Sequence, residues 1–126
     1  MKFSGLDPGR QFGRTLTFIP DINGDGIEDL ALAELGPGET TGRIYIVYGR
    51  RSWTSAEFDL ATLDGSNGFA IDGVSADDRP GRSLSTCDLN KDGYSDIISG
   101  AFFTDVGEKI DVGRVYVVFG FANGSA

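Results

Sequence analysis

The chain has 126 residues, enough for one modest domain with its own core, and 40% of them are hydrophobic. It contains no histidine and a single cysteine. This composition excludes Ser-His-Asp and Cys-His catalysis, the usual histidine-containing zinc centres and a disulfide within the chain. The formal charge of −8 disfavours a nucleic-acid backbone or an anionic membrane surface as a partner. No apolar segment is long enough to span a membrane, and no signal-peptide core follows the first three residues.

Nineteen glycines and many runs of β-branched and aromatic residues predict an all-β chain of short strands. In chain order we expect strands at residues 2–6, 12–19, 29–35, 43–48, 69–74, 82–87, 96–103 and 114–119. Cys87 ends one of these strands and is predicted to be buried. Asp77 and Asp78 lie in the polar segment SADDRPG, which predicts a solvated turn.

The segment DINGDGIED, residues 21–29, concentrates acidic side chains between two expected strands. Its alternate residues offer hard oxygen donors, and the glycine at its sixth position permits a sharp turn. The candidate metal ligands are Asp21, Asn23, Asp25, Asp29 and the backbone carbonyl of Ile27. Ca²⁺ accepts such a mixture of carboxylate, amide and carbonyl oxygens. The alternative is an ordinary turn whose acidic side chains lie in solvent.

The segment DLNKDGYSD, residues 88–96, repeats this spacing 67 positions later. Its candidate ligands are Asp88, Asn90, Asp92, Asp96 and the carbonyl of Tyr94. Two matched copies predict two Ca²⁺ ions per chain, which would cancel four of the eight net negative charges. An EF-hand loop needs a Glu at its twelfth position, where these segments have Leu32 and Ser99. Each loop is therefore expected to lead into a strand.

The repeat extends beyond the two loops. GRTLTFIPDINGDGIEDLALA aligns with GRSLSTCDLNKDGYSDIISGA, and GRIYIVYG aligns with GRVYVVFG. At residues 44–48 and 115–119 both alternating faces are apolar or aromatic, which is typical of a strand covered on both sides. A period of about 70 residues with several strands per unit indicates stacked four-stranded sheets.

These motifs resemble the FG-GAP repeats that form the blades of the integrin alpha-chain β-propeller, with most likeness to bacterial integrin-like repeat proteins. The resemblance covers nearly the entire chain, including the connecting segment at residues 57–73. It implies one repeat domain, residues 1–126, made of two β-propeller blades at residues 7–74 and 75–126. Each blade would have four antiparallel strands, with a calcium loop between its first and second strand.

The name-giving motifs of the family are only partly kept. Phe12-Gly13 supplies Phe-Gly in the first repeat, but the second repeat has Pro80-Gly81. Gly100-Ala101-Phe102 stands where the family has Gly-Ala-Pro, and the first repeat has Leu32-Ala33-Glu34. The calcium positions are intact, so only the calcium role is carried over from the family.

Counting strands leaves the second blade one strand short. Residues 12–74 supply four strands, residues 82–119 supply three, and residues 2–6 are similar to an outer strand. We expect that first strand to complete the open blade of a neighbouring copy. Three or four identical chains would then close into a six- or eight-bladed ring, a homotrimer or homotetramer. The alternative is a fragment of a longer propeller protein.

The resemblance implies a calcium-binding scaffold for protein or glycan recognition or adhesion, outside the cell or at its surface. The alternative is an accessory domain of a larger FG-GAP protein, since related repeats also accompany catalytic domains. No acidic pair outside the loops indicates hydrolysis by two carboxylates, so we expect the chain not to be an enzyme. Tyr94, Trp53 and Arg50-Arg51 are candidate ligand contacts. Alternatively, Tyr94 is a loop side chain beside its metal-binding carbonyl, Trp53 covers a blade edge, and the two arginines are solvated charges.

Overall fold

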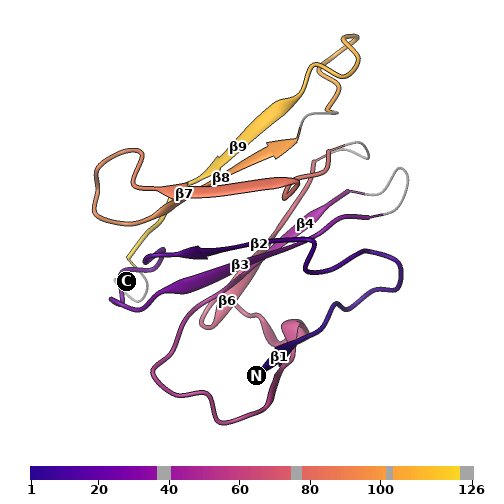
Figure 1. Ribbon diagram of the computed structural model, residues 1–126. Coiled ribbons are helices and arrows are strands. Elements are labelled where there is room, and N and C mark those ends of the chain that lie inside the picture. The colour runs from indigo at the N-terminus through magenta and orange to yellow at the C-terminus, as the bar shows by residue number, and fades with distance from the viewer. Residues whose placement is uncertain (37–40, 75–77, 102–103, 123–126) are drawn as a thin grey trace.

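The computed structural model describes residues 1–36, 41–74, 78–101 and 104–122, and its regular structure is almost entirely β. Figure 1 shows the sheets as stacked layers, with the N-terminal strand at the far side of the first large sheet from the second. No helix in these described ranges is long and apolar enough to cross a membrane. The elements are β1 (Lys2–Phe3), β2 (Thr15–Ile19), β3 (Asp29–Glu34), β4 (Arg43–Val47), β5 (Glu57–Phe58), the 3₁₀ turn η1 (Leu60–Thr62), β6 (Gly68–Asp72), β7 (Ser83–Cys87), β8 (Asp96–Ala101) and β9 (Arg114–Val118).

Two antiparallel sheets carry the repeat. The first has the strand order β2-β3-β4-β6, and the second has the order β7-β8-β9 (Figure 1). This arrangement confirms the predicted all-β class. Two expected strands begin later than predicted, because Gly13 and Gly81 adopt left-handed backbone with φ of 82° and 94° before β2 and β7. The expected strand at 96–103 ends at Ala101, and residues 102–103 lie outside the described part of the chain.

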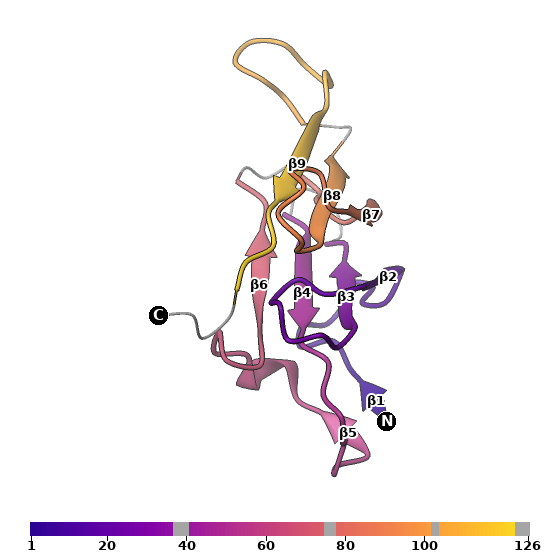
Figure 2. The ribbon, with the colours of Figure 1, turned by 90° about the vertical axis from the view of Figure 1, so that its left-hand side faces the viewer.

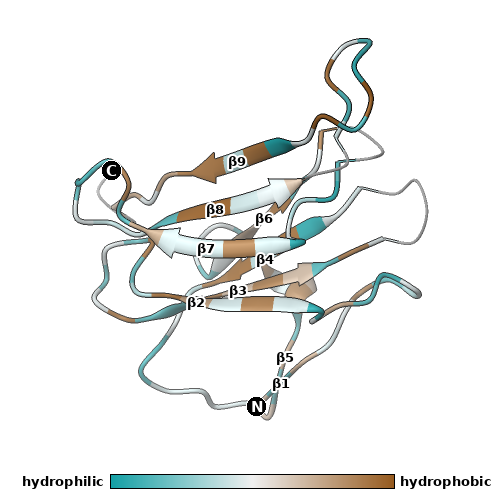
Figure 3. Ribbon diagram, turned by 45° about the horizontal axis from the view of Figure 1, so that its top comes forward, coloured by the Kyte–Doolittle hydropathy of each residue, from teal (hydrophilic) through white to brown (hydrophobic). Residues whose placement is uncertain are grey.

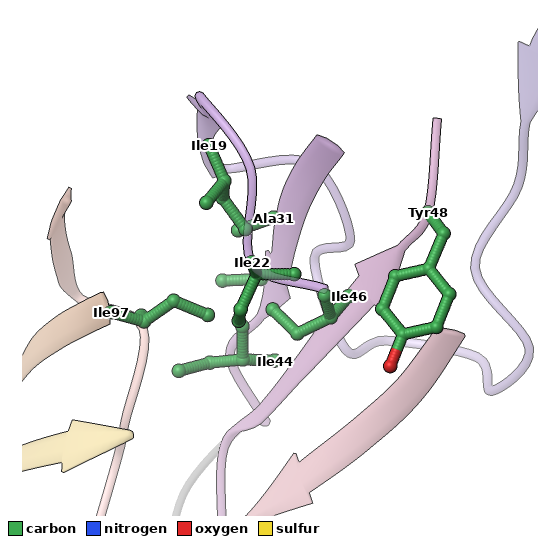
Figure 4. Close-up of a cluster of buried hydrophobic side chains, with 8 residues drawn as sticks. Ile19, Ile22, Ala31, Ile44, Ile46, Tyr48 and Ile97 are labelled. Atoms are coloured by element: carbon green, nitrogen blue, oxygen red, sulfur yellow. The ribbon is translucent and has the colours of Figure 1, made fainter. Parts of the chain in front are cut away.

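The space between the two sheets is filled by aliphatic side chains and one tyrosine. The fully buried members of this cluster are Ile19, Ile22, Ala31, Ala33, Ile44, Ile46, Tyr48 and Ile97. Figure 4 shows Ile97 of β8 reaching across to the side chains of the first sheet. Alternation along β4 turns Ile44 and Ile46 into this cluster. The repeat unit therefore buries one sheet face against the next unit, as its apolar strands predict.

The opposite face of the first sheet is covered by segments of the same chain. A second cluster there contains Leu32, Tyr45, Val47, Phe58 and Leu60. The strand β4 is thus covered on both sides, as predicted. The matching strand β9 is not, because Val115 and Val117 on its outer face are exposed. Figure 3 shows this apolar stretch of β9 at the edge of the second sheet.

The N-terminal segment differs from its prediction. The strand expected at residues 2–6 is limited to β1, which pairs in parallel with β5 of the same chain. An ion pair of 3.3 Å between Lys2 and Glu57 accompanies this pairing. The aromatic rings of Phe3, Trp53 and Phe58 contact one another edge-on or tilted, with centroids 5.6 to 6.1 Å apart. Figure 2 shows β1 and β5 beside each other, below the first sheet. The packing of these aromatic rings stabilises the pairing of β1 with β5, and local sequence patterns do not predict such packing.

Two predictions about single residues are wrong. Cys87 is exposed, because alternation along the edge strand β7 turns Ser83, Ser85 and Cys87 away from the first sheet. Asp78 is fully buried instead of solvated, because the hydroxyl groups of Tyr116 in β9 and of Thr104, in the segment between β8 and β9, lie against it. Its neighbour Asp77 lies outside the described residues.

Candidate metal centre

The first acidic loop is folded around the carboxylate of Asp21. One oxygen of this carboxylate accepts the N–H groups of Gly24 and Asp25 at 2.6 and 3.2 Å, and the other accepts Gly26 N–H at 2.8 Å. Gly24 and Gly26 have φ of 76° and 79°, values that glycine adopts without strain. Asp21 therefore organises three successive backbone donors, which explains why this segment turns sharply.

Asp29 fastens the loop to the sheet. Its carboxylate is 2% exposed and accepts the N–H of Ile22 and the N–H of Gly49, both at 2.8 Å. Burial raises the pKa of Asp29, and the nearby charges of Asp25 and Asp21 raise it further, while the two backbone hydrogen bonds lower it. The charges of Asp25 and Asp21 thus lie near enough to Asp29 to disfavour its ionised form. A cation placed among them would relieve this repulsion.

The remaining candidate ligands of the first loop lie at the same place. The side-chain amide of Asn23 donates to Asp25 Oδ2 at 3.1 Å, and Asn23 Oδ1 accepts the N–H of Asp25 at 3.3 Å. The N–H of Ile27 donates to Asp25 Oδ1 at 2.8 Å. The structure therefore brings all five predicted residues of this loop together.

The second loop repeats most of the internal hydrogen bonds of the first. Asp88 accepts the N–H of Asp92 at 3.0 Å and of Gly93 at 2.9 Å. Asp96 accepts Leu89 N–H at 2.7 Å and Gly120 N–H at 2.9 Å, as Asp29 does in the first loop. The contacts that complete the match are Asn90 Nδ2 to Asp92 Oδ2, Asp92 N to Asn90 Oδ1, and Tyr94 N to Asp92 Oδ1. Two segments of different sequence thus fold in one way.

The donor chemistry of both loops fits a hard divalent cation. Each loop gathers carboxylate and amide oxygens, with no thiol or imidazole, and Ca²⁺ prefers such oxygen ligands. In the described part of the chain, however, no group of three or more acidic, His or Cys side chains is arranged as a ready metal site. The carboxylate oxygens are directed at backbone N–H groups, so ligation would require small rearrangements of these side chains.

Two glycines that complete the loops were not predicted as part of the site. Gly49 and Gly120 follow β4 and β9 and donate their N–H groups to Asp29 and Asp96. A Cβ atom at Gly49 would lie 1.9 Å from the carbonyl oxygen of Glu28. The signal was present in the sequence, because both glycines occupy matched positions of the repeat at the end of GRIYIVYG and GRVYVVFG.

The two loops contact each other. Ser95 donates its N–H to the carbonyl of Asp21 at 2.7 Å, and its hydroxyl accepts the N–H of Asp21 at 3.3 Å. The ring of Tyr94 lies against Gly24, where an added Cβ would be 2.4 Å from Cε1. Asn23 is consequently 3% exposed, whereas its counterpart Asn90 is exposed. Tyr94 packs between the loops, which favours its interpretation as a loop side chain.

A pocket of about 640 Å³ lies beside the first loop. It is lined by apolar side chains, among them Phe18 and Leu30, and by Arg50, Arg51 and Trp53. The guanidinium of Arg50 lies 4.5 Å from the centroid of the Trp53 ring, within the range of a cation–π contact. The structure thus brings together two of the candidate recognition features that the sequence indicates.

The buried carboxylate of Asp78 joins the two sheets. It accepts hydrogen bonds from the hydroxyls of Thr104 and Tyr116 and from Val74 N–H at 3.1 Å, and it lies 3.4 Å from Arg114 Nη1. Burial alone would raise the pKa of Asp78, but these hydrogen bonds together with the Arg114 charge outweigh it and the pKa is lowered. The ionised carboxylate of Asp78 therefore links the segment after β6 to the second sheet.

Stacked antiparallel sheets, with an acidic loop between the first two strands of each, define an all-β repeat protein whose sheets are consistent with β-propeller blades. Residues 80–118 match the FG-GAP repeat. The chain belongs to the FG-GAP repeat family, as its motifs predict.

Integrin alpha chains and a phospholipase resemble the chain over most of its length. It is 30% identical to integrin alpha-4 of Xenopus laevis over 112 residues, which cover 88% of the chain and 10% of that protein. It is 35% identical to phosphatidylinositol-glycan-specific phospholipase D of Rattus norvegicus over 108 residues, which cover 82% and 13%. It is 36% identical to integrin alpha-M of Mus musculus over 100 residues, which cover 75% and 8%. The chain thus spans about a tenth of the length of these relatives.

Proposed function

We propose that the chain is a calcium-stabilised β-propeller unit that serves as a scaffold for protein or glycan recognition or adhesion, outside the cell or at its surface. Its two FG-GAP blades would be residues 7–74 and 75–126. The observation that carries this proposal is the matched hydrogen bonding of the two acidic loops. Likeness to integrin alpha chains supports the recognition role and the location.

Each loop would hold one Ca²⁺ ion through its own oxygen donors. The ligands would be Asp21, Asn23, Asp25, Asp29 and the Ile27 carbonyl in the first loop, and Asp88, Asn90, Asp92, Asp96 and the Tyr94 carbonyl in the second. A bound cation would neutralise the clustered carboxylates and fix the hairpin at the start of each blade. Asp29 and Asp96 would transmit this order to the sheets, because each also bonds the glycine after the third strand of its blade.

Several copies of the chain would assemble into a closed ring of blades. Within the described residues the second sheet has three strands where the first has four, so its edge strand β9 is open to a further strand. Residues 2–6 of a neighbouring copy would fill this place in a homotrimer or homotetramer, giving six or eight blades. Such strand exchange requires the two-residue pairing of β1 with β5 to open.

Calcium titration tests the metal sites directly. Isothermal titration calorimetry should give two Ca²⁺ ions per chain, and Asp25→Ala or Asp92→Ala should each reduce this number to one. Binding of no calcium by the folded chain would refute the metal part of the proposal. Light scattering in calcium tests assembly, for which a mass of three or four times 13.4 kDa is expected. A monomer at all concentrations would refute the ring.

A second candidate function is that of an accessory domain in a larger FG-GAP protein, including one with a catalytic domain. The observation that favours it is the likeness to phosphatidylinositol-glycan-specific phospholipase D, of which the chain spans 13%. Under this alternative the chain would bind calcium and remain monomeric. Mass and calcium stoichiometry measured on one sample therefore separate the two candidates.

A further inference from the structure

The internal repeat allows each residue of the first half to be compared with its counterpart in the second half. Four apolar positions are at most 4% exposed in the first half and 39 to 65% exposed in the second. The buried residues are Ile22, Ile44, Ile46 and Tyr48, and their exposed counterparts are Leu89, Val115, Val117 and Phe119. The buried set packs between the two sheets (Figure 4). The exposed set is termed the donor face.

The opposite side of the first sheet shows the reverse difference. Leu16 and Phe18 of β2 are each 61% exposed. Their counterparts, Leu84 and Thr86 of β7, lie on the strand face that is turned towards the first sheet, and Leu84 packs against the buried cluster. The stack of two sheets therefore ends in two unlike apolar surfaces, and each corresponds to one side of the contact that is already made inside the chain.

The pocket beside the first loop is one open part of this second surface. Phe58 and Leu60 cover another part of the same sheet face. Among the pocket-lining residues, Leu30 and Val47 have Ile97 and Val118 as their counterparts, and these belong to or pack against the cluster that contains Ile22 and Tyr48. The same geometry would seat the counterparts of Ile22 and Tyr48 in the pocket, and these are Leu89 and Phe119. The pocket together with Leu16 and Phe18 is termed the acceptor face.

Charge complementarity identifies the partner. The pocket of the acceptor face carries Arg50 and Arg51 in a chain of net charge −8. On the donor face, Leu89 lies in the second acidic loop, next to Asp88. Inside the chain Gly24 contacts Tyr94, and the counterparts of these residues in the repeat are Lys91 and Ile27. Lys91 of one copy would therefore lie against Ile27 of the next, beside the carboxylate of Glu28. Opposite charges would thus meet at two places in the contact.

We propose that the donor face of one copy docks on the acceptor face of a second copy, with Leu89 and Phe119 entering the pocket beside Trp53. This contact is head to tail, so it repeats from copy to copy until a ring closes. The inference rests on the assembly part of the proposed function and specifies which surfaces make it. It does not depend on strand exchange by residues 2–6.

The only tryptophan of the chain reports on the pocket. With increasing concentration of the full chain in calcium, the mass from light scattering should rise and the emission of Trp53 should shift to shorter wavelength together with it. Phe119→Asp on the donor face and Phe18→Asp on the acceptor face should each stay monomeric with unshifted emission, because a charge would be buried in the contact. Val117→Asp is a second donor variant. Ile110→Asp, at an exposed position outside both faces, should assemble like the wild type.

A mixture of the two variants gives the decisive result. Phe18→Asp keeps an intact donor face and Phe119→Asp keeps an intact acceptor face, so an equimolar mixture should form a dimer of twice 13.4 kDa and grow no further. Assembly of either variant alone, or a mixture that stays monomeric while the wild type assembles, would overturn the assignment of surfaces and leave the ring itself standing. A monomeric wild type that binds two Ca²⁺ ions would overturn both the ring and this contact, but not the metal sites.

Discussion

The substitution Asp29→Asn separates two roles of this residue, accepting backbone hydrogen bonds in the fold and binding the proposed calcium ion. The carboxylate accepts two backbone N–H groups at 2.8 Å each while being 2% exposed. An amide of the same shape can accept with one atom only, so one backbone donor would face an NH₂ group. A hydrogen bond to a charged group contributes about 1.5–3 kcal/mol, and a stranded buried donor costs about 1–3 kcal/mol. We expect the free energy of unfolding in chelator to fall by about 3 kcal/mol, out of roughly 5–15 kcal/mol.

Urea denaturation with and without chelator measures this loss. Glu28→Gln is the matched control, because Glu28 is the exposed neighbour of Asp29. In calcium the loss for Asp29→Asn should be larger than in chelator, by about 2.7 kcal/mol when calcium exceeds the wild-type dissociation constant a hundredfold. Equal stability of Asp29→Asn and Glu28→Gln in chelator would refute the structural role. An equal loss in chelator and in calcium would refute the metal role.

Four further substitutions test other contacts. Asp25→Ala or Asp92→Ala should lower the melting temperature strongly in calcium but cost only about 0.5–1.5 kcal/mol in chelator, since each carboxylate accepts exposed hydrogen bonds; calorimetry in both conditions checks this. Asp78 has a pKa in the folded state below its ordinary value of 3.8, so its carboxylate stabilises the fold above that pH and the contribution is lost as the pH falls through the lowered pKa. In Asp78→Asn the free energy of unfolding should therefore fall less as the pH is lowered. An unchanged dependence on pH would contradict the role of the Asp78 carboxylate in linking the two sheets. Gly49→Ala should destabilise more than Gly13→Ala, because its Cβ would strike a backbone oxygen at 1.9 Å, whereas nothing lies within 4 Å at Gly13; thermal melts compare the two.

The features that the sequence predicts correctly are those set by local chemistry. Alternation and turn residues indicate β2, β3 and β4, and the same signals recur in the second half because the units are copies. The acidic loops follow from the spacing of their donors and glycines, which determines the backbone hydrogen bonds within nine residues. Local order of this kind needs no knowledge of distant neighbours.

The features that the sequence does not predict depend on contacts between distant segments. Asp78 is buried only because Thr104 and Tyr116 are brought to it from 26 and 38 positions further along the chain. Cys87 is exposed because no sheet formed by the described residues covers the outer side of β7. The parallel pairing of β1 with β5 joins residues 55 positions apart. Apolar residues on both faces of a strand indicate that both faces can be buried. They do not show whether another sheet or segment lies against each face.

In a copy that has not assembled, the contact between the loops would make the exchange of their bound ions with solvent unequal. Ser95 and Tyr94 close over the first loop, whereas the second loop has no such neighbour among the described residues. An ion in the first loop would have to wait for the second loop to move before it could leave, while an ion in the second could leave directly. Rapid mixing with a chelator should then release calcium in two kinetic phases. The slower phase would vanish in Tyr94→Ala, so the residence time of one ion would be set by the side chain of a residue whose backbone carbonyl would bind the other.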